Sequence, residues 1–221
     1  IDRDLTTKIL GFSELKINSV AAQMSRGKLE KSIAISLSAF GDTLSKLCMD
    51  ICLYMGQDYG FVSFPNDLTT GSSIMPHKKN PDLFELVRAK FNLIKGLPNQ
   101  LTLLTSNLPS GYHRDLQQAK GAIIESINET KACLEILLLS LPKIKVSNNI
   151  IDQKKYDYLF TVESLNKEVL KGKTFRDAYR NLANVIEKGK FKPDRKVKHK
   201  HIGSLGNLAI DRLKEKIKPF L

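Results

Sequence analysis

The sequence contains no tryptophan, and aromatic residues make up only 7% of the chain. Domains that bind nucleic acid through zinc fingers or RNP-type sheets need cysteine–histidine pairs or aromatic residues at fixed spacings. Neither pattern occurs in this sequence. The lack of these residues argues against a nucleic-acid-binding module.

Cysteine is also scarce. The chain has an odd number of cysteines, Cys48, Cys52 and Cys133, and no C-x-x-C pair. Cys48 and Cys52 lie one helical turn apart, but no histidine or acidic residue follows at ligand spacing. We therefore interpret them as small core residues and expect no metal site. A chain without a disulfide framework fits a reducing, cytoplasmic compartment.

Long hydrophobic runs are missing as well. No apolar segment approaches the ~20 residues that a membrane-spanning helix needs, so we expect no membrane partner. The first residue is Ile1 and not a methionine. We interpret this start as the sign of a fragment or a processed chain.

Positive charge, in contrast, is abundant, with a formal net charge of +12 at pH 7. Such an excess can be a solvated basic surface, can attract nucleic acid, or can serve an enzyme with a polyanionic substrate. Because the nucleic-acid motifs are absent, we expect no nucleic-acid partner. A small anionic substrate explains part of the excess equally well.

Apolar residues recur at spacings of three and four along three long segments, and each seam predicts a helix of about 25 residues. Pro98 lies inside the second seam and predicts a kink in that helix, not its end. The first seam is Leu29, Ile33, Leu37, Phe40, Leu44, Leu47, Ile51 and Tyr54; the second is Phe84, Val87, Phe91, Ile94, Leu97, Leu101 and Leu104; the third is Leu116, Lys120, Ile123, Ile127, Thr130, Leu134 and Leu137.

The pattern changes after Lys155, where shorter helical segments follow, one of them with Thr174 as a plausible N-cap. We predict an all-α fold, with residues 1–155 forming a long-helix bundle that carries the catalytic loop and residues 156–221 forming a small helical domain. Three rods with apolar seams cannot bury all their apolar surface alone. We therefore expect them to associate with helices of other chains.

The segment Thr69–Lys90 contains a glycine-serine loop, two lysines and then Asn80-Pro81-Asp82. Asn80 is a good N-cap, and Pro81 and Asp82 suit the first turn of a helix. Hydroxyl and ammonium groups beside a helix N-terminus suit an anionic substrate and make a hydroxyl easier to ionise. On composition alone, a solvated loop with lysines for solubility is the better interpretation.

A second loop, Asn107–Arg114, precedes the third seam. Lys120 falls on that apolar stripe, where a lysine either extends to water at the end of a bundle or faces a ligand. Gln117 and Tyr112, which lie close by in sequence, favour the ligand.

Taken together, the two loops resemble one enzyme family. The run G-S-S-I-M-P-H-K-K-N-P-D-L-F-E-L-V-R-A-K, followed by L-P-S-G-Y-H-R-D-L-Q-Q-A-K, is similar to argininosuccinate lyase of the fumarase/aspartase superfamily. Other members share the first loop but not the second. The resemblance covers essentially all of this chain and corresponds to the family's C-terminal half.

The resemblance implies β-elimination of argininosuccinate to arginine and fumarate in arginine biosynthesis, without a redox cofactor. It implies a homotetramer whose active site is shared between subunits. By the same resemblance, Ser72 is the catalytic serine, and Lys78 and Asn80 hold the carboxylate and the developing charge. Glu85 tunes a catalytic histidine of a neighbouring chain. Tyr112, Gln117 and Lys120 match substrate-binding positions, and Ser73 is both a substrate-binding candidate and the rival of Ser72.

Two other functions stay open at this stage. One is a different lyase of the superfamily, chiefly adenylosuccinate lyase, although the second loop argues against it. The other is a structural protein without turnover, as the lens crystallins of this family are. The N-terminal half of the family is not in this sequence, so we expect this chain alone to be inactive.

Overall fold

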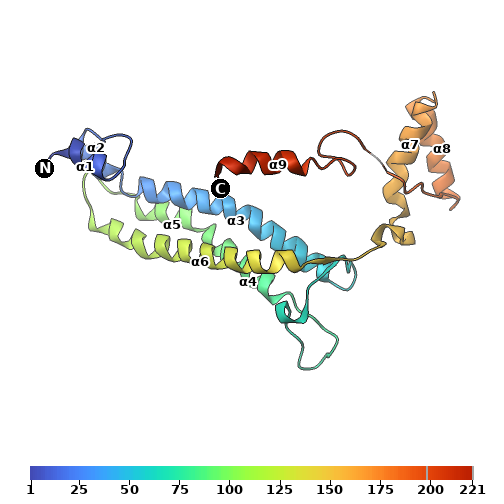
Figure 1. Ribbon diagram of the computed structural model, residues 1–221, viewed down its shortest axis with the longest axis horizontal. Helices are drawn as coiled ribbons and strands as arrows, with labels where there is room; N and C mark the ends of the chain where they lie inside the picture. The colour runs from blue at the N-terminus through green and yellow to red at the C-terminus, as the bar shows by residue number, and fades with distance from the viewer. Residues whose placement is uncertain (198, 221) are drawn as a thin grey trace. The chain divides into compact units, whose positions relative to one another are not determined.

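The computed structural model describes residues 1–197 and 199–220 of the chain. Contacts between residues divide the chain into two units, Ile1–Ser147 and Asn148–Leu221, and each is described by itself. Figure 1 shows long helices lying along one another in the first unit, and a pair of short helices in the second. The domain boundary expected at Lys155 stays a prediction.

The first unit is built from helices. Their bounds are α1 Arg3–Ile9, α2 Ser19–Met24, α3 Lys28–Met55, α4 Asp82–Ile94, α5 Leu97–Leu104 and α6 Gln118–Ser140, with 3-10 turns η1 Asn66–Leu68, η2 Arg114–Gln117 and η3 Leu141–Lys143. Within the described residues the strands are β1 Val62–Ser63 and β2 Lys145–Val146, an antiparallel pair with Val62 opposite Val146. The predicted all-α fold class is confirmed.

The inward face of α3 is lined mainly by small side chains. Its buried residues are Ala34, Gly41, Ser45, Cys48 and Ile51. A Cβ placed on Gly41 would lie 3.2 Å from a ring carbon of Phe91, so α3 and α4 approach each other closely at this point. Small residues permit this approach because a side chain would otherwise hold the helix axes apart.

The predicted first seam does not coincide with this buried face. Leu29 is 62% exposed, Ile33 36% and Phe40 41%. The large apolar residues in the N-terminal half of α3 are therefore only partly covered within this chain, while the helix that the seam predicted is present. The small residues beside them pack inward, and the large ones are left partly uncovered.

The second seam is buried as predicted from Phe84 to Leu101, but it runs along two helices. Helix α4 ends at Ile94, and α5 begins at Leu97 with Pro98 in its first turn. Pro98 lacks an N–H, and its ring conflicts with the carbonyl group four residues earlier. The expectation of a kink within one helix is therefore wrong, because α4 ends before the proline.

The first turns of the third seam differ from the predicted pattern. Lys120 is exposed, and Ala119 occupies the buried position with 1% exposure. The cause is the 3-10 turn η2, which ends at Gln117 immediately before α6. A 3-10 turn has three residues per turn, so the helical spacing cannot be extended from Leu116 across it to Lys120.

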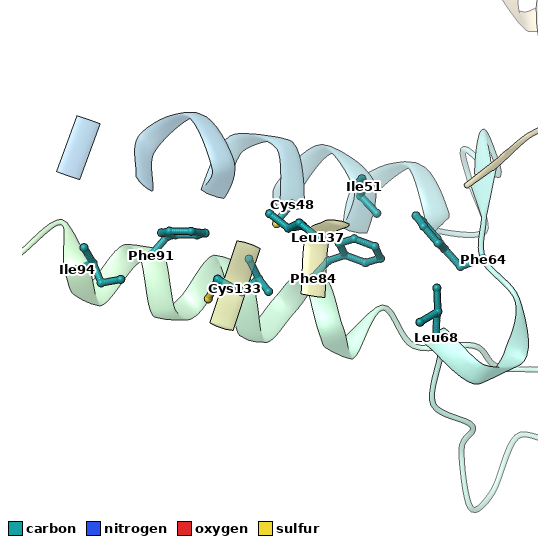
Figure 2. Packing of buried hydrophobic residues seen from close by; sticks show 10 residues of the cluster. Cys48, Ile51, Phe64, Leu68, Phe84, Phe91, Ile94, Cys133 and Leu137 are labelled. Atoms are coloured by element: carbon teal, nitrogen blue, oxygen red, sulfur yellow. The ribbon is translucent and has the colours of Figure 1, made fainter. Parts of the chain in front are cut away.

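The main core lies where α3, α4 and α6 meet. Figure 2 shows Phe84 and Phe91 of α4 together with Cys48 and Ile51 of α3, and Phe64 and Leu68 close one end. Phe84, Phe91, Cys48 and Cys133 have no exposed surface. A second cluster packs α5 against α3 and α6 and consists of Ala34, Leu97, Leu101, Ala119 and Ile123. The core thus holds three segments that are far apart in sequence.

The second unit contains η4 Ile150–Asp152, η5 Lys154–Phe160, α7 Thr161–Leu170, α8 Phe175–Glu187, α9 Ile210–Ile217 and η6 Lys218–Phe220. Thr174 caps α8, as predicted, by accepting a hydrogen bond from the N–H of Asp177 at 3.2 Å. Within residues 1–197 and 199–220, none of the helices combines the length and the apolar character that crossing a membrane requires.

The fully buried Phe91 predicts a large effect of its truncation. Replacing Phe91 by alanine removes the ring from the contact with Gly41, and we expect a loss of about 3–5 kcal/mol in the free energy of unfolding. Phe12→Ala is the matched control, since Phe12 is 66% exposed in the same unit, and it should cost less than about 0.5 kcal/mol. Urea denaturation measures both, and equal losses would contradict the packing described.

Candidate active site

The first candidate loop leaves η1 and returns to the start of α4. Its ends are joined by a bridge in which the Asn80 N–H donates to the Thr70 carbonyl at 2.8 Å and the Thr70 N–H donates to the Asn80 carbonyl at 3.3 Å. Pro81, and not Asn80, is the N-cap of α4. The predicted capping role of Asn80 is therefore wrong, because its backbone is paired across the loop and its Nδ2 donates to the Gly71 carbonyl at 3.4 Å.

Ser72 and Ser73 differ in their surroundings. The Ser72 hydroxyl oxygen accepts hydrogen bonds from the N–H groups of Ile74, at 3.2 Å, and Met75, at 3.1 Å. Ser73 is exposed, whereas Ser72 is half-buried. Two N–H groups pointing at one oxygen stabilise negative charge on it. Ser72 therefore differs from Ser73 in having two N–H groups directed at its hydroxyl oxygen.

Lys78, Asn80 and Glu85 line one hollow with a volume of about 730 Å³, which is closed on its other side by the C-terminal end of α3. Lys78 and Glu85 are both exposed, and Glu85 lies in the first turn of α4. His77 lines the same hollow. The structure thus brings together three of the predicted site residues, with Ser72 on the same loop.

The second loop leads into η2 and α6. Gln117 donates from Nε2 to the Tyr112 hydroxyl at 2.9 Å, so these two predicted residues are in contact. Lys120 lies one turn further on, and all three side chains are exposed. This second cluster is therefore open to any ligand or chain that approaches it.

Beside the second loop lies a hollow of about 370 Å³ that the sequence analysis missed. Its lining includes the cationic side chains of Arg26, Lys28 and Lys31 together with His113. The basic run Arg26-Gly27-Lys28 is the signal in the sequence that points to it. Gly27 has a φ of +78°, and a Cβ there would come within 2.6 Å of the Thr105 methyl group, so the position requires glycine.

The start of α3 is held by one carboxylate. Glu30 accepts from Arg26 Nε and from the Gly27 N–H, both at 2.8 Å. Burial alone raises the pKa of the Glu30 carboxyl, but hydrogen bonds from the backbone and from Arg26 outweigh burial, and the pKa lies below its ordinary value of 4.5. Glu30 therefore stays ionised and ties Arg26 to the helix beside the second loop.

Burial raises the pKa of all three cysteine thiols above the ordinary value. Burial raises the pKa of the Cys48 thiol to about 12, with smaller contributions from Cys52 and Cys133. A thiol with that pKa is protonated at neutral pH, which makes it a weak nucleophile. No three histidine, cysteine or acidic side chains gather into a possible metal site within residues 1–197 and 199–220.

The two candidate clusters lie at opposite ends of α3. The first loop faces the end of α3 at Met55 and Gly56, and the second loop faces its start at Gly27 and Lys28. Helix α3 has 28 residues, which makes it about 40 Å long at 1.5 Å per residue. Figure 1 shows the same separation between the loop before α4 and the loop before α6. A small molecule therefore cannot contact both clusters within one copy of the chain.

Comparisons with known proteins agree with the resemblance of the loops. A family model described as Lyase matches residues 4–96. The chain is 47% identical to an argininosuccinate lyase of Phocaeicola vulgatus over 96% of its length and 48% of the relative. It is 49% identical to one of Parabacteroides distasonis (95% and 47%) and 39% identical to one of Thermotoga neapolitana (83% and 46%). The chain thus spans about half the length of the curated relatives it matches.

Solved structures support the fold. A fumarate lyase:delta crystallin from Brucella melitensis superposes with a TM-score of 0.68 at 18% identity, covering 86% of this chain and 42% of that one. EDDS lyase in complex with formate gives a TM-score of 0.63 at 22% identity, covering 86% and 38%. At these identities the likeness concerns the fold alone.

The lowered pKa of Glu30 predicts how its contribution depends on pH. Because the folded-state pKa lies below the unfolded value, the stabilisation is present above about pH 4.5 and is lost as the pH falls through the folded pKa. We expect Glu30→Gln to lower the free energy of unfolding by about 1 kcal/mol at pH 7. The deficit relative to wild type should shrink below pH 4.

Urea denaturation between pH 3 and pH 7 tests this expectation. Glu135→Gln is the control, because Glu135 is exposed on α6 and has no ion-pair partner in the part of the chain that the structure describes. It should change stability by less than about 0.5 kcal/mol. A Glu30→Gln deficit that grows at low pH would contradict the assignment.

Proposed function

Because the chain belongs to the argininosuccinate lyases of the fumarase/aspartase superfamily and matches the C-terminal half of its relatives, we propose that it forms one share of an argininosuccinate lyase. The observation that carries this proposal is the identity of 46–49% to several argininosuccinate lyases over nearly the whole chain. Both candidate loops lie within the residues that match.

The proposed reaction is a β-elimination. A base removes a proton from the carbon next to a substrate carboxylate, and the resulting carbanion is held as an aci-carboxylate dianion. The carbon–nitrogen bond then breaks, and an acid protonates the departing guanidinium nitrogen. The products are fumarate and arginine, and the substrate's atoms and electrons balance without a redox partner. Cations and N–H groups around the dianion lower the barrier.

We assign Ser72 to proton transfer in this reaction. The two N–H groups that donate to its oxygen support this role, since they favour the ionised hydroxyl. Lys78 and Asn80, which line the adjoining hollow, are proposed to hold the carboxylate and its developing charge. Glu85, in the first turn of α4, is proposed to tune a histidine of a neighbouring chain. Ser73 remains a substrate-binding candidate.

Tyr112, Gln117 and Lys120 are proposed to bind substrate in a site that they share with another copy. The separation of the two clusters along α3 supports this arrangement, because one chain cannot present both to one substrate. Two copies packed antiparallel would bring the first loop of one beside the second loop of the other. We propose a homotetramer that completes its sites in this way.

Uncovered apolar side chains on the first unit support association. Leu86 and Leu93 on α4, Leu103 on α5 and Leu138 on α6 are 59–80% exposed. Apolar side chains left uncovered in one copy are stabilised when another chain removes them from water. We also propose that the protein acts in the cytoplasm, in arginine biosynthesis, with no nucleic-acid partner, and that residues 1–155 and 156–221 are its domains here.

Two alternatives are distinguished by assay. Another lyase of the superfamily, such as adenylosuccinate lyase, would act on a different succinyl substrate. A crystallin-like protein would assemble without turnover. The names of the relatives favour argininosuccinate as the substrate.

Complementation tests the proposed function. We expect the 221-residue chain to show no measurable lyase activity alone, because losing one proton-transfer partner costs ~10²–10⁴ in rate. Mixed with the N-terminal half of the Phocaeicola vulgatus relative, it should regain activity and sediment as an assembly. Fumarate release is followed by ultraviolet absorbance.

Each result of this experiment is informative. An assembled mixture that eliminates nothing from argininosuccinate would contradict the proposed function. Turnover by the chain alone, at the rate of an intact relative, would show that the second proton-transfer group is in this chain. His113 would then be the first suspect, since it lies in the second loop.

The two serines predict different kinetic effects in the complemented protein. Ser72→Ala should lower kcat by ~10²–10⁴ while KM changes little, because the group acts in the transition state. Ser73→Ala is the matched control at the next position and should lower kcat by less than about tenfold. The reverse order of effects would move the role from Ser72 to Ser73.

A further inference from the structure

We propose that Thr70 and Asp82 are positioning residues for the proposed elimination: together they latch the base of the Ser72 loop onto the first turn of α4. This inference rests on the proposed function for its kinetic consequence. The latch itself is a structural feature that can be tested without substrate.

The latch is formed at the point where the loop joins the helix. The Thr70 hydroxyl donates a hydrogen bond to the Asp82 carboxylate. The backbone bridge between Thr70 and Asn80 and the bond from Asn80 Nδ2 to the Gly71 carbonyl lie directly beside it. Hydrogen bonds to an ionised acceptor are stronger than those between neutral groups. The side-chain bond thus adds a charge-assisted contact to a short bridge.

Beyond its base, the loop has little else to hold it. Residues 73–79 are exposed, and their hydrogen bonds are local, such as the Lys78 N–H to the Met75 carbonyl at 3.0 Å. A loop with local contacts and a single closed base can move as one body about that base. The direction in which Ser72 points is therefore set where Thr70 meets Asp82.

The partner of Thr70 links two proposed catalytic groups. Asp82 and Glu85 both lie in the first turn of α4, whose N-terminal position favours a carboxylate. Fixing the loop to Asp82 therefore also fixes it relative to Glu85 and to the hollow that Glu85 lines. A small displacement of a catalytic group can cost a large factor in rate. The latch would thus hold the loop in one orientation relative to α4.

The alternative is that Asp82 merely complements the helix N-terminus and that Thr70 is an ordinary loop hydroxyl. Thr70→Val separates the two, because valine keeps the shape of threonine but cannot donate. Thr70→Ser restores the hydroxyl. Thr69→Val is the matched control, since the Thr69 hydroxyl donates to the Pro65 carbonyl at 3.5 Å and not to a carboxylate.

The first measurement is the initial rate at which trypsin cuts after Lys78 and Lys79 in the chain by itself. We expect Thr70→Val to raise this rate about fivefold, with Thr70→Ser and Thr69→Val near wild type and with unchanged melting temperature. If Thr70→Val lowers the melting temperature, the same cutting rate is measured for Asp82→Asn instead. This variant keeps an acceptor oxygen but loses the charge. Equal cutting of Thr70→Val and Thr70→Ser would overturn the latch.

The second measurement is made in the complemented protein. Thr70→Val should lower kcat about tenfold with KM within about twofold, and Thr70→Ser should recover most of the rate. The double variant Thr70→Val/Asp82→Asn should be no slower than the slower single variant. Unchanged kcat with faster cutting would overturn the positioning role. A mixture without any activity would contradict the proposed function, while the cutting rates would still decide the latch.

Discussion

The close approach of α3 to α4 is the constraint on which the first unit depends. Gly41 lies against Phe91, with Ala34, Ser45 and Cys48 on the same face of α3. Because this face is small, the aromatic rings of α4 can fill the space between the helices, and dispersion contacts accumulate along both. Because the small residues face inward, the larger residues of α3, such as Leu29 and Phe40, are partly exposed to solvent.

This arrangement separates stability from function. The core lies along the facing sides of the helices, with Phe84 and Phe91 at its centre, and the polar loops lie at the two ends of α3. A rigid helix then serves as a spacer of about 40 Å between the loops. This spacing is consistent with the proposed sharing of sites between copies, because each end of the helix can be presented to a different neighbour.

The first loop combines a fixed base with an exposed body. Its two ends are paired through Thr70 and Asn80, and its middle from Ser73 to Lys79 is open to solvent. Loops that carry catalytic groups on rigid scaffolds commonly have this character, because they must admit and enclose a substrate. The hydrogen bonds to the Ser72 oxygen come from N–H groups of the loop itself, so they do not depend on contacts with the rest of the chain.

The sequence by itself determined the helical class, the buried row from Phe84 to Leu101, the Thr174 cap and the relation to argininosuccinate lyases, because these depend on spacing and on local motifs. Tertiary structure decided which face of α3 is buried, since Gly41 packs on Phe91 while Leu29 and Ile33 remain partly exposed. It also decided that Lys120 is exposed, that Pro81 and not Asn80 caps α4, and that Ser72 and not Ser73 receives two N–H groups. Each of these depends on backbone direction at a turn or on contact between distant segments. The periodicity of a sequence contains no information about either.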